Sequence, residues 1–336
     1  MEYPRSGGGG WRFLGKMPRL AIIAPVLNEP RWLRLFVTWH RAAGVERFYF
    51  YLDGESPPVR DALAAYPMAT VTVEERDRSK EHAALFHSRC MNDAFLRARE
   101  EGIDWLLAID PDEYAWGSTP AHPERFSLSE MLAGVPDHVE EVVLSTLEAQ
   151  PLASWMERPF WEDLLVIHDR MVEREVLDPL DGSMRRLSRW LGHRLGKSLI
   201  RTKVDAFAFN PHRWTRDPTL PIPAMSPFVQ MTGGCHLHLP VLHGVQWREK
   251  FESFQHHTTY PRGHGMEFPK LSWSQSAATM TDEACKDYFA TWLALSSEQV
   301  NEAVAGGILS RASEFERKFR ELRAWDYMAA EDVCTR

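Results

Sequence analysis

Three acidic side chains, Asp110, Asp112 and Glu113, follow directly after the apolar residues 105–109. Two carboxylates one residue apart can share a hard divalent cation or hold its water ligands, and the cation can bridge the phosphates of a nucleotide. Pro111 stiffens the turn between the two aspartates. An Asp-x-Asp pair alone is also typical of solvated loop acids or of the start of a helix. The surrounding segments are therefore needed to decide between a metal site and these alternatives.

Polar residues also follow two other predicted strands, as Asn28-Glu29 and as Asp53-Gly54. In open α/β sheets, ligands bind outside the carboxyl ends of the strands, so we expect these groups and the acids to converge on one edge. The first strand is not followed by G-x-G-x-x-G, which disfavours a Rossmann dinucleotide site. The sequence also lacks G-x-x-x-x-G-K-[ST], which excludes a P-loop.

The elements that must position these residues alternate between strand and helix. Continuous apolar runs rich in β-branched and aromatic residues predict buried strands, and stripes of apolar residues at helical spacing predict the helices between them. The predicted strands are 20–26, 47–52, 69–75 and 104–110, and the predicted helices are 30–44, 57–66 and 79–102. This alternation predicts an α/β protein with a mostly parallel central sheet.

The rest of the chain is less regular. We expect a further strand at 140–148, a hairpin over 197–214, and a strand with a Gly-Gly kink at 230–242. Residues 150–196 show no clear period and are predicted to form loops and short helices. The segments after residue 245 have helical patterns.

Composition limits the classes of function. The 336 residues carry a net charge of −8, which argues against nonspecific binding of nucleic acid. The four cysteines lie far apart without a C-x-x-C pair, as expected for reduced thiols in a cytoplasmic protein. Residues 1–13 lack the apolar core of a signal peptide, and no apolar run reaches the about 18 residues of a membrane span. We therefore expect a cytoplasmic protein, in solution or peripheral to a membrane.

Two segments together resemble a known enzyme group. LNEPRWLRLFVTWHRAAGVERFYFYLDGES (27–56) and WLLAIDPDEY (105–114) are similar to the nucleotide-sugar domain of glycosyltransferase family 92 and family 2-like proteins. The matching residues are Asn28, Glu29, Trp39, His40, Gly44, Val45, Phe48, Tyr51, Asp53, Trp105, Asp110, Asp112, Glu113 and Tyr114. Their order and spacing are more specific than any single motif, and they cover about residues 20–116.

The second half resembles the same group more loosely. GKSLIRTKVDAFAFNPH (196–212) is similar to a G-K-x-I-x-R segment that ends in a histidine, and HLPV (238–241) to an H-F/Y-P-V element. Leu242 and His243 stand where the group has R-S, although Glu249 and Phe251 continue the pattern. Because of this departure, the contacts that R-S would make to the acceptor or to phosphate are not expected at these two positions.

The resemblance implies a GT-A fold, a UDP- or GDP-sugar donor, and Mn²⁺ or Mg²⁺ as the metal. It divides the chain into a flexible leader, a catalytic domain with a nucleotide-sugar half and an acceptor half, and a helical C-terminal extension. The predicted bounds are 1–17 for the leader, 18–245 for the catalytic domain with halves 18–118 and 119–245, and 246–336 for the extension.

The resemblance also implies metal ligands. Asp112 is the expected direct ligand, and Asp110 shares the metal or touches the ribose. Glu113 either supports the ligands or caps the next turn. His236 and His238 face one side of a predicted strand, and His238 is expected to complete the metal shell. His236 and His243 are alternative metal ligands. The simpler interpretation is that the histidine is a hydrogen-bonded core residue and binds no metal.

Several residues are expected to contact the donor. Pro25, Val26, Asn28 and Glu29 end the first strand, where the uracil or guanine edge lies in the resembling enzymes. Asp53 is expected to bond the base or ribose, unless it serves only the Asp-Gly turn. Lys197 and Arg201 share a strand face and would neutralise the leaving diphosphate, or are solvated charges. Arg78 is a further diphosphate contact, with Arg76 and Lys80 as alternatives.

An inverting transfer also needs a carboxylate that deprotonates the acceptor hydroxyl. We favour Asp163 or Glu162 for this role, because Trp161 beside them could stack on a sugar ring, with Glu148 as the alternative. A retaining enzyme needs no such base.

The sequence thus predicts a metal-dependent glycosyltransferase, inverting, that moves a hexose to a hydroxyl of a glycan, a lipid-linked glycan or a small metabolite. The alternatives are a non-catalytic nucleotide- or sugar-binding protein on the same scaffold and a sugar nucleotidyltransferase. The latter ranks lower because residues 24–32 lack a Gly-rich basic loop. The sequence leaves the sugar, the acceptor and the oligomeric state open.

Overall fold

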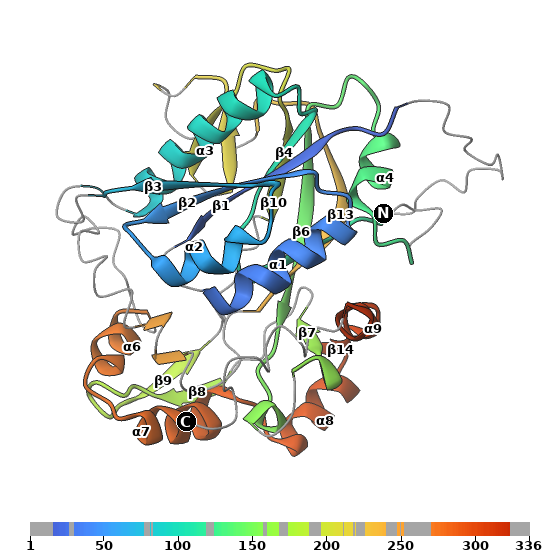
Figure 1. The fold of residues 1–336 in the computed structure, drawn as a ribbon. Coiled ribbons are helices and arrows are strands. Elements are labelled where there is room, and N and C mark those ends of the chain that lie inside the picture. Colours follow the sequence, from blue (N-terminus) through green and yellow to red (C-terminus); the bar gives the residue numbers. More distant parts are fainter. Residues whose placement is uncertain are drawn as a thin grey trace.

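The computed structural model describes residues 16–26, 30–76, 81, 83–118, 124–156, 160–167, 174–187, 196–210, 212–217, 219, 226–239, 247–248, 250–251 and 270–322. One large sheet with helices on both faces forms the upper part of the molecule in Figure 1, and smaller strands and C-terminal helices form the lower part.

The first four strands are parallel neighbours in the order β3-β2-β1-β4. They are β1 (Leu20–Val26), β2 (Arg47–Asp53), β3 (Ala69–Glu74) and β4 (Trp105–Ala108). Because they are parallel, their carboxyl ends lie at the same edge of the sheet. The predicted α/β order is confirmed for this half of the chain.

Helices cover both faces of these strands. Helices α1 (Pro30–Ala42) and α2 (Pro57–Ala64) lie on one face, and α3 (Ala83–Glu100) lies on the other (Figure 1). Alternate residues of β1 therefore enter different clusters, since Ile22 packs with Phe36 of α1 and Ile23 packs with Phe95 of α3. Burial on both faces explains the continuous apolar run in this strand.

The second half of the sheet mixes directions. Strand β10 (Lys197–Arg201) runs antiparallel between β4 and β6 (Glu141–Ala149). Strand β13 (Gln230–His238) pairs with β5 (Glu113–Trp116) and with β6. Helix α4 (Leu128–Ala133) contacts β13.

The prediction of a hairpin over 197–214 was wrong for the first of its two strands. Residues 197–201 form a central strand of the main sheet, and the hairpin is β11 (Phe207–Asn210) with β12 (Arg213–Thr215). Leu199 and Ile200 are both fully buried, as expected for a strand that is covered on both faces.

The Gly-Gly kink predicted in β13 is confirmed. Its pairing with β6 shifts between Thr232 and Cys235, and Gly234 has a φ of +68°. A Cβ atom added at Gly234 would lie 2.4 Å from the carbonyl oxygen of Trp116. Glycine at this position therefore permits both the left-handed backbone and the close approach of β5.

Residues 150–196 contain more strand than the sequence indicated. Beside the short helices η1 (Ala153–Met156) and η2 (Phe160–Glu162), the structure has strand β7 (Leu165–Ile167) and the hairpin β8 (Arg174–Leu177) with β9 (Met184–Leu187). Strands of three or four residues are too short to show a period of two in the sequence.

The C-terminal region is mainly helical, as predicted. It contains α6 (Lys270–Ala277), α7 (Asp282–Tyr288), the π-helix η4 (Phe289–Leu293), α8 (Ser297–Ala305) and α9 (Ser313–Glu321). It also supplies β14 (Leu309–Arg311), which pairs with β7 at the edge of the main sheet. Phe315 of α9 stacks on Trp39 of α1 with ring centroids 5.6 Å apart, so this region packs directly on the first helix.

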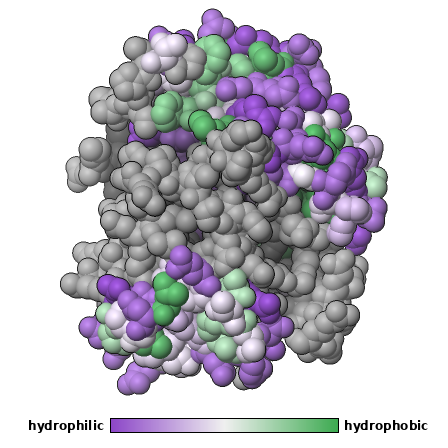
Figure 2. All heavy atoms as spheres, turned by 90° about the vertical axis from the view of Figure 1, so that its left-hand side faces the viewer, coloured by the Kyte–Doolittle hydropathy of each residue, from purple (hydrophilic) through white to green (hydrophobic). Residues whose placement is uncertain are grey.

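The surface of the described residues is mostly polar on the face shown in Figure 2, where apolar residues lie in separate small groups. Within the part of the chain that the structure describes, no helix has the length and apolar character needed to cross a membrane.

Candidate functional site

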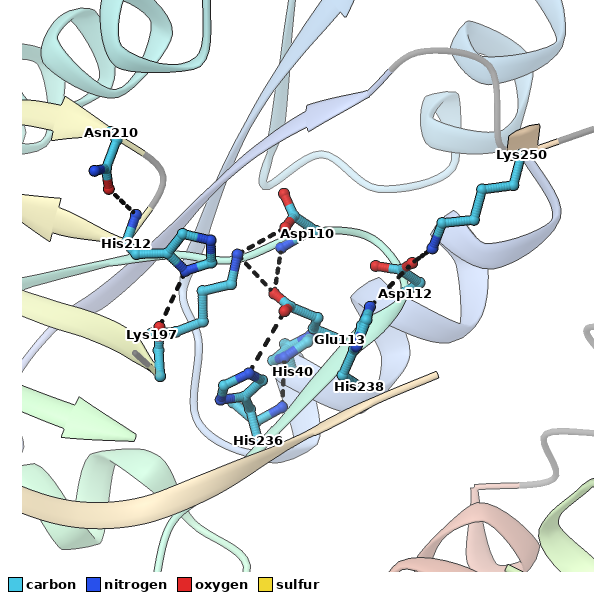
Figure 3. Close-up of polar contacts among 12 residues, drawn as sticks. His40, Asp110, Asp112, Glu113, Lys197, Asn210, His212, His236, His238 and Lys250 are labelled. Carbon is cyan, nitrogen blue, oxygen red and sulfur yellow. Dashed lines mark hydrogen bonds and ion pairs between the residues drawn. The ribbon is translucent and has the colours of Figure 1, made fainter. Parts of the chain in front are cut away.

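The acidic residues form a tight turn between β4 and β5 at the carboxyl edge of the parallel strands (Figure 3). The backbone N–H of Glu113 donates to the carbonyl oxygen of Asp110 at 3.0 Å, which closes the turn. The backbone N–H of Asp110 donates to the Glu113 carboxylate at 2.9 Å. The sequence prediction that a buried strand delivers these acids to the sheet edge is therefore correct.

Lys197 reaches two of the three acids. Its Nζ lies 2.6 Å from Asp110 Oδ2 and 3.0 Å from Glu113 Oε2, and its side chain is 1% exposed. The antiparallel register of β10 brings Lys197 just beyond the end of β4. Burial alone lowers the pKa of Lys197, but Asp110 and Glu113 raise it more, so the ammonium stays charged.

Glu113 is held on several sides. Besides Lys197 and the Asp110 N–H, its Oε1 lies 3.5 Å from His236 Nε2. Burial raises the pKa of Glu113, but Lys197 and His236 lower it well below its ordinary value. These contacts suit a structural support for the turn, one of the two roles expected for Glu113.

Asp112 faces a different set of partners. Its Oδ2 lies 2.6 Å from Lys250 Nζ and 3.7 Å from His238 Nε2. Burial raises the pKa of Asp112, whereas Lys250 and His238 lower it further, so the net shift is downward. Burial lowers the pKa of His238, but the nearby carboxylates of Asp112 and Glu148 raise it more, so the net shift is upward.

Glu148 extends this row of side chains. Parallel pairing sets His238 of β13 opposite Glu148 of β6, and His238 Nδ1 lies 3.8 Å from Glu148 Oε1. Asp112, His238 and Glu148 thus come from three strands or strand ends and follow one another across the sheet edge. The structure places two of the predicted metal ligands, Asp112 and His238, beside one of the predicted bases, Glu148, whereas Asp110 pairs with Lys197.

The two histidines of β13 face the acids, as predicted. His236 lies beside Glu113 and His238 beside Asp112, while Cys235 and Leu237 pack in the apolar cluster on the opposite side of the strand. This alternation separates the Cys235 thiol from the two imidazoles.

Trp39 and His40 hold the strand that follows the acids. Trp39 Nε1 donates to the carbonyl oxygen of Ala115 at 2.8 Å, and the Ala115 N–H donates to His40 Nε2 at 3.2 Å. His40 Nδ1 donates to the carbonyl oxygen of Phe36, and burial lowers the His40 pKa to about 3. The adjacent Trp and His of the resemblance thus satisfy both backbone polar groups of Ala115.

Asp53 lies at the end of β2 in a buried ion pair. Its Oδ2 is 2.6 Å from Arg76 Nη2, and both side chains are nearly inaccessible. Arg76 also lies over the ring of Phe86 in α3, with 5.6 Å to the centroid. The predicted nucleotide contact at Asp53 and the alternative phosphate contact at Arg76 are therefore joined. Pro25 and Val26 end the neighbouring strand β1, where Pro25 is half-buried and Val26 is buried.

Arg201 lies away from the acids. Strand β10 carries it to the Trp105 end of β4, where its Nε donates to the Val139 carbonyl at 2.6 Å. Its guanidinium lies 4.3 Å from the centre of the Trp105 ring. The two cations predicted to act together therefore stand at opposite ends of one strand.

Glu162 and Asp163 also lie apart from the acids. The ladder between β6 and β7 sets Glu148 opposite Ile167, so residues 162 and 163 extend beyond the far end of β7. Arg311 of β14 donates to the Glu162 carbonyl at 3.0 Å. Trp161, the expected sugar platform, is 5% exposed and packs in an apolar cluster with Phe319.

Five predicted or alternative site residues lie outside the described part of the chain. These residues are Asn28, Glu29, Arg78, Lys80 and His243.

Sequence reasoning missed Lys250 and His87. Lys250 is separated from Asp112 by 138 positions, and no local pattern distinguishes it from a solvated lysine. His87 of α3 feels the charges of Asp110 and Arg76, and burial lowers its pKa. In the sequence, its spacing of four from Met91 and seven from Ala94, which are both buried, is the available signal that it faces the sheet.

The donor chemistry of the site fits a divalent cation at Asp112 and His238. Carboxylate oxygen and imidazole nitrogen are ligands that Mn²⁺ accepts in proteins. Asp112 Oδ2 and His238 Nε2 face one another at 3.7 Å, which is too long for a direct hydrogen bond. Within the same described residues, no group of three or more His, Cys, Asp or Glu side chains is already arranged around a cation position.

Solved structures of glucosyl-3-phosphoglycerate synthase from Mycobacterium tuberculosis are distantly similar to this chain. The complex with phosphoglyceric acid has a TM-score of 0.35 at 13% identity and covers 74% of this chain and 85% of that one. The complex with Mn²⁺ and uridine-diphosphate-glucose has a TM-score of 0.33 at 12% identity and covers 71% and 79%.

Sequence comparisons match part of the chain to one protein family. Residues 22–144 match Glycosyltransferase family 92. A glycosyltransferase-like protein of Arabidopsis thaliana is 26% identical over 234 residues, which cover 61% of this chain and 51% of the relative. A second one is 20% identical over 226 residues, covering 59% and 43%. The chain thus spans about half the length of the curated relatives it matches. These matches confirm the predicted resemblance: residues 22–144 are similar to glycosyltransferase family 92, and the chain is similar to glycosyltransferase-like proteins.

Proposed function

We propose that this protein is a metal-dependent, inverting glycosyltransferase that transfers a hexose from a UDP- or GDP-sugar to a hydroxyl acceptor. The observation that carries the proposal is the convergence of Asp112, His238 and Glu148 at the carboxyl edge of the parallel strands. Ligands of open α/β sheets bind at this edge, and His238 lies within 4 Å of both Asp112, a candidate metal ligand, and Glu148, a candidate base.

Asp112 and His238 would hold the cation, with Asp110 beside them. The bound cation, Mn²⁺ or Mg²⁺, would offset the negative charge that develops on the leaving diphosphate. Lys197 keeps the turn in place by pairing with Asp110 and Glu113, so that Asp112 points to its partners from a fixed backbone. Lys197 therefore acts on the donor through Asp110 in this account, and not by direct contact with phosphate.

The nucleoside would lie over the ends of β1 and β2. Pro25 and Val26 would border the base, with Asn28 and Glu29 following them in sequence. Asp53 would accept hydrogen bonds from base or ribose, with its carboxylate oriented by the ion pair to Arg76. Arg78 remains our candidate for a further diphosphate contact.

Glu148 is our candidate for the catalytic base. During transfer, the acceptor oxygen would attack the anomeric carbon, the bond to the diphosphate would break, and Glu148 would take the hydroxyl proton. Glu148 Oε1 lies 3.8 Å from His238 Nδ1, whereas the Glu162 carbonyl accepts from Arg311 of β14 and the charge of Asp163 acts on the same arginine. The position of Glu148 beside the proposed cation ligands supports it over the two residues that the sequence favoured.

The acceptor and the location in the cell complete the proposal. We infer an acceptor hydroxyl on a glycan, a lipid-linked glycan or a small metabolite, and a cytoplasmic protein. Cys90, Cys235 and Cys285 are free thiols, as expected for a reducing compartment.

Calorimetry with a panel of nucleotide sugars, with and without Mn²⁺, tests the function. Metal-stimulated binding followed by release of the nucleoside diphosphate in the presence of an acceptor supports a glycosyltransferase. Binding without turnover on any acceptor would favour a non-catalytic scaffold, and release of pyrophosphate from a nucleoside triphosphate would favour a nucleotidyltransferase.

A further inference from the structure

Lys250 occupies the side of Asp112 where a cation is expected. Its Nζ lies 2.6 Å from Asp112 Oδ2, and the two side chains are 17% and 12% exposed. Lys250 comes from the region that follows β13, so it is not part of the turn that carries the acids (Figure 3). A half-buried ammonium in direct contact with a carboxylate is a strong local counter-charge.

The position of Lys250 is fixed by apolar packing. Trp247 and Phe251, which flank it one helical turn apart, are fully buried and lie with ring centroids 5.6 Å apart. Both pack against Trp273 of α6, at 6.2 Å and 5.0 Å between centroids. The ammonium therefore reaches Asp112 from a backbone held in the apolar cluster of the C-terminal region.

The acidic side chains of the turn pair with two different lysines. Lys197 pairs with Asp110 and Glu113, and Lys250 pairs with Asp112. A divalent cation held between Asp112 Oδ2 and His238 Nε2 would have to share Oδ2 with a positive ammonium at 2.6 Å or replace that ammonium. Two cations cannot both approach one partly buried carboxylate oxygen so closely without strong repulsion.

We propose that Lys250 competes with the divalent cation for Asp112, and that it withdraws when the metal arrives together with the donor diphosphate. This inference rests on the proposed function, because the metal is that of the proposed transfer reaction. Lys250 is a positioning residue in this scheme, since it acts through Asp112. Its ammonium satisfies Asp112 in the free protein and makes binding of metal alone weak.

Titration calorimetry with Mn²⁺ alone tests the competition. Lys250→Gln removes the charge but keeps a hydrogen-bond donor for Asp112, and it should raise the affinity for Mn²⁺ at least about tenfold. Lys250→Met should act in the same direction, and Lys250→Arg should retain the weak binding of the wild type. Lys318→Met is the matched control, because Lys318 is 19% exposed and pairs with Glu321 at 3.3 Å in α9.

The outcomes separate this inference from the proposed function. Tighter Mn²⁺ binding in Lys250→Gln that disappears when Asp112→Asn is added supports the inference. Equal, Asp112-dependent affinity in wild type and Lys250→Gln would overturn it and leave the metal site intact. Absence of Mn²⁺ binding in every variant would overturn both the inference and metal dependence. Competition at Asp112 in a protein that binds no nucleotide sugar would overturn the transfer reaction alone.

Thermal unfolding gives a second readout that does not depend on turnover. At a given concentration, Mn²⁺ that binds the folded state more tightly stabilises it more. The rise in Tm on adding Mn²⁺ should therefore be larger for Lys250→Gln than for the wild type or for Lys318→Met. An equal rise in all three proteins would contradict the competition.

Discussion

Lys197 Nζ lies between Asp110 Oδ2 at 2.6 Å and Glu113 Oε2 at 3.0 Å. A strand that begins 84 positions after Glu113 thus supplies the counter-charge for the turn of acids. The pairing explains how a buried strand can end in three carboxylates, because two of them share one buried ammonium. Asp112, the third, is left to face His238 and Lys250.

Removing this ammonium should destabilise the fold. Lys197→Met leaves Glu113, which is 7% exposed, as a buried carboxylate without its cation. Breaking a buried pair in this way costs about 3–5 kcal/mol. Urea denaturation should show this loss, whereas Lys203→Met, at an exposed position two residues after β10, should change stability by less than about 0.5 kcal/mol.

The reason for the loss can be checked with a second substitution. Adding Glu113→Gln to Lys197→Met removes the unpaired charge, so the double variant should recover part of the stability. If the double variant is as unstable as the sum of the two single variants, the ion pair is not what Lys197 contributes.

His40 predicts a pH dependence of stability. Burial holds its folded-state pKa at about 3, below the about 6.5 of an unfolded chain, so the unfolded state binds a proton first. The stabilisation from His40 is therefore complete above pH about 6.5 and declines as the pH falls toward 3. Between pH 7 and 5, the loss from this group should be about 2 kcal/mol.

His40→Gln should remove that part of the pH dependence and also weaken the bond to the Ala115 N–H. Denaturant unfolding of wild type and variant at pH 7 and pH 5 measures both effects. The exposed His138→Gln serves as the control and should follow the wild type. The assignment fails if His40→Gln loses as much stability between the two pH values as the wild type does.

Gly234 and Gly307 form a matched pair of backbone tests. Both have a positive φ, +68° and +66°, but an added Cβ meets the Trp116 carbonyl at 2.4 Å only at Gly234. Gly307→Ala should cost about 1–2 kcal/mol for its left-handed backbone. Gly234→Ala should cost clearly more in the same unfolding measurement, and equal costs would show that the close approach of β5 is not limiting.

Glu148 is expected to accept the proton of the acceptor hydroxyl. Glu148→Gln should lower kcat by about 10²–10⁴-fold and leave the Kd for donor nucleotide nearly unchanged, because only the base is lost. Glu162→Gln and Asp163→Asn are the comparison variants and should keep kcat within a few-fold of the wild type. Loss of kcat in Asp163→Asn with an active Glu148→Gln would restore the assignment favoured by the sequence.

Local patterns predicted the parallel half of the fold well. The apolar run of β1 and the helical stripe of α1 each reflect burial against their sequence neighbours, so a single segment carries the information. The acids at 110–113 were also predictable, because a strand end fixes where its next residues lie. The kink at Gly234 could be predicted from the glycine pair alone.

Contacts between distant segments were not predictable in the same way. Lys250 reaches Asp112 across 138 positions, and its role depends on apolar packing around Trp247 and Phe251. Arg201 shares a face with Lys197, but four residues of strand separate them by about 13 Å, which takes Arg201 out of the site. The sequence predicted a sugar platform at Trp161, but its indole is buried. Sequence alone does not distinguish a buried indole from an exposed one.

Binding of a nucleotide sugar to wild type and Asp112→Asn, titrated by calorimetry with and without Mn²⁺, measures whether Asp112 couples the metal to the donor. Mn²⁺ should strengthen donor binding at least about tenfold in the wild type and have no effect in Asp112→Asn, while both proteins unfold cooperatively. Donor binding that Mn²⁺ strengthens equally in both proteins would rule out metal binding through Asp112.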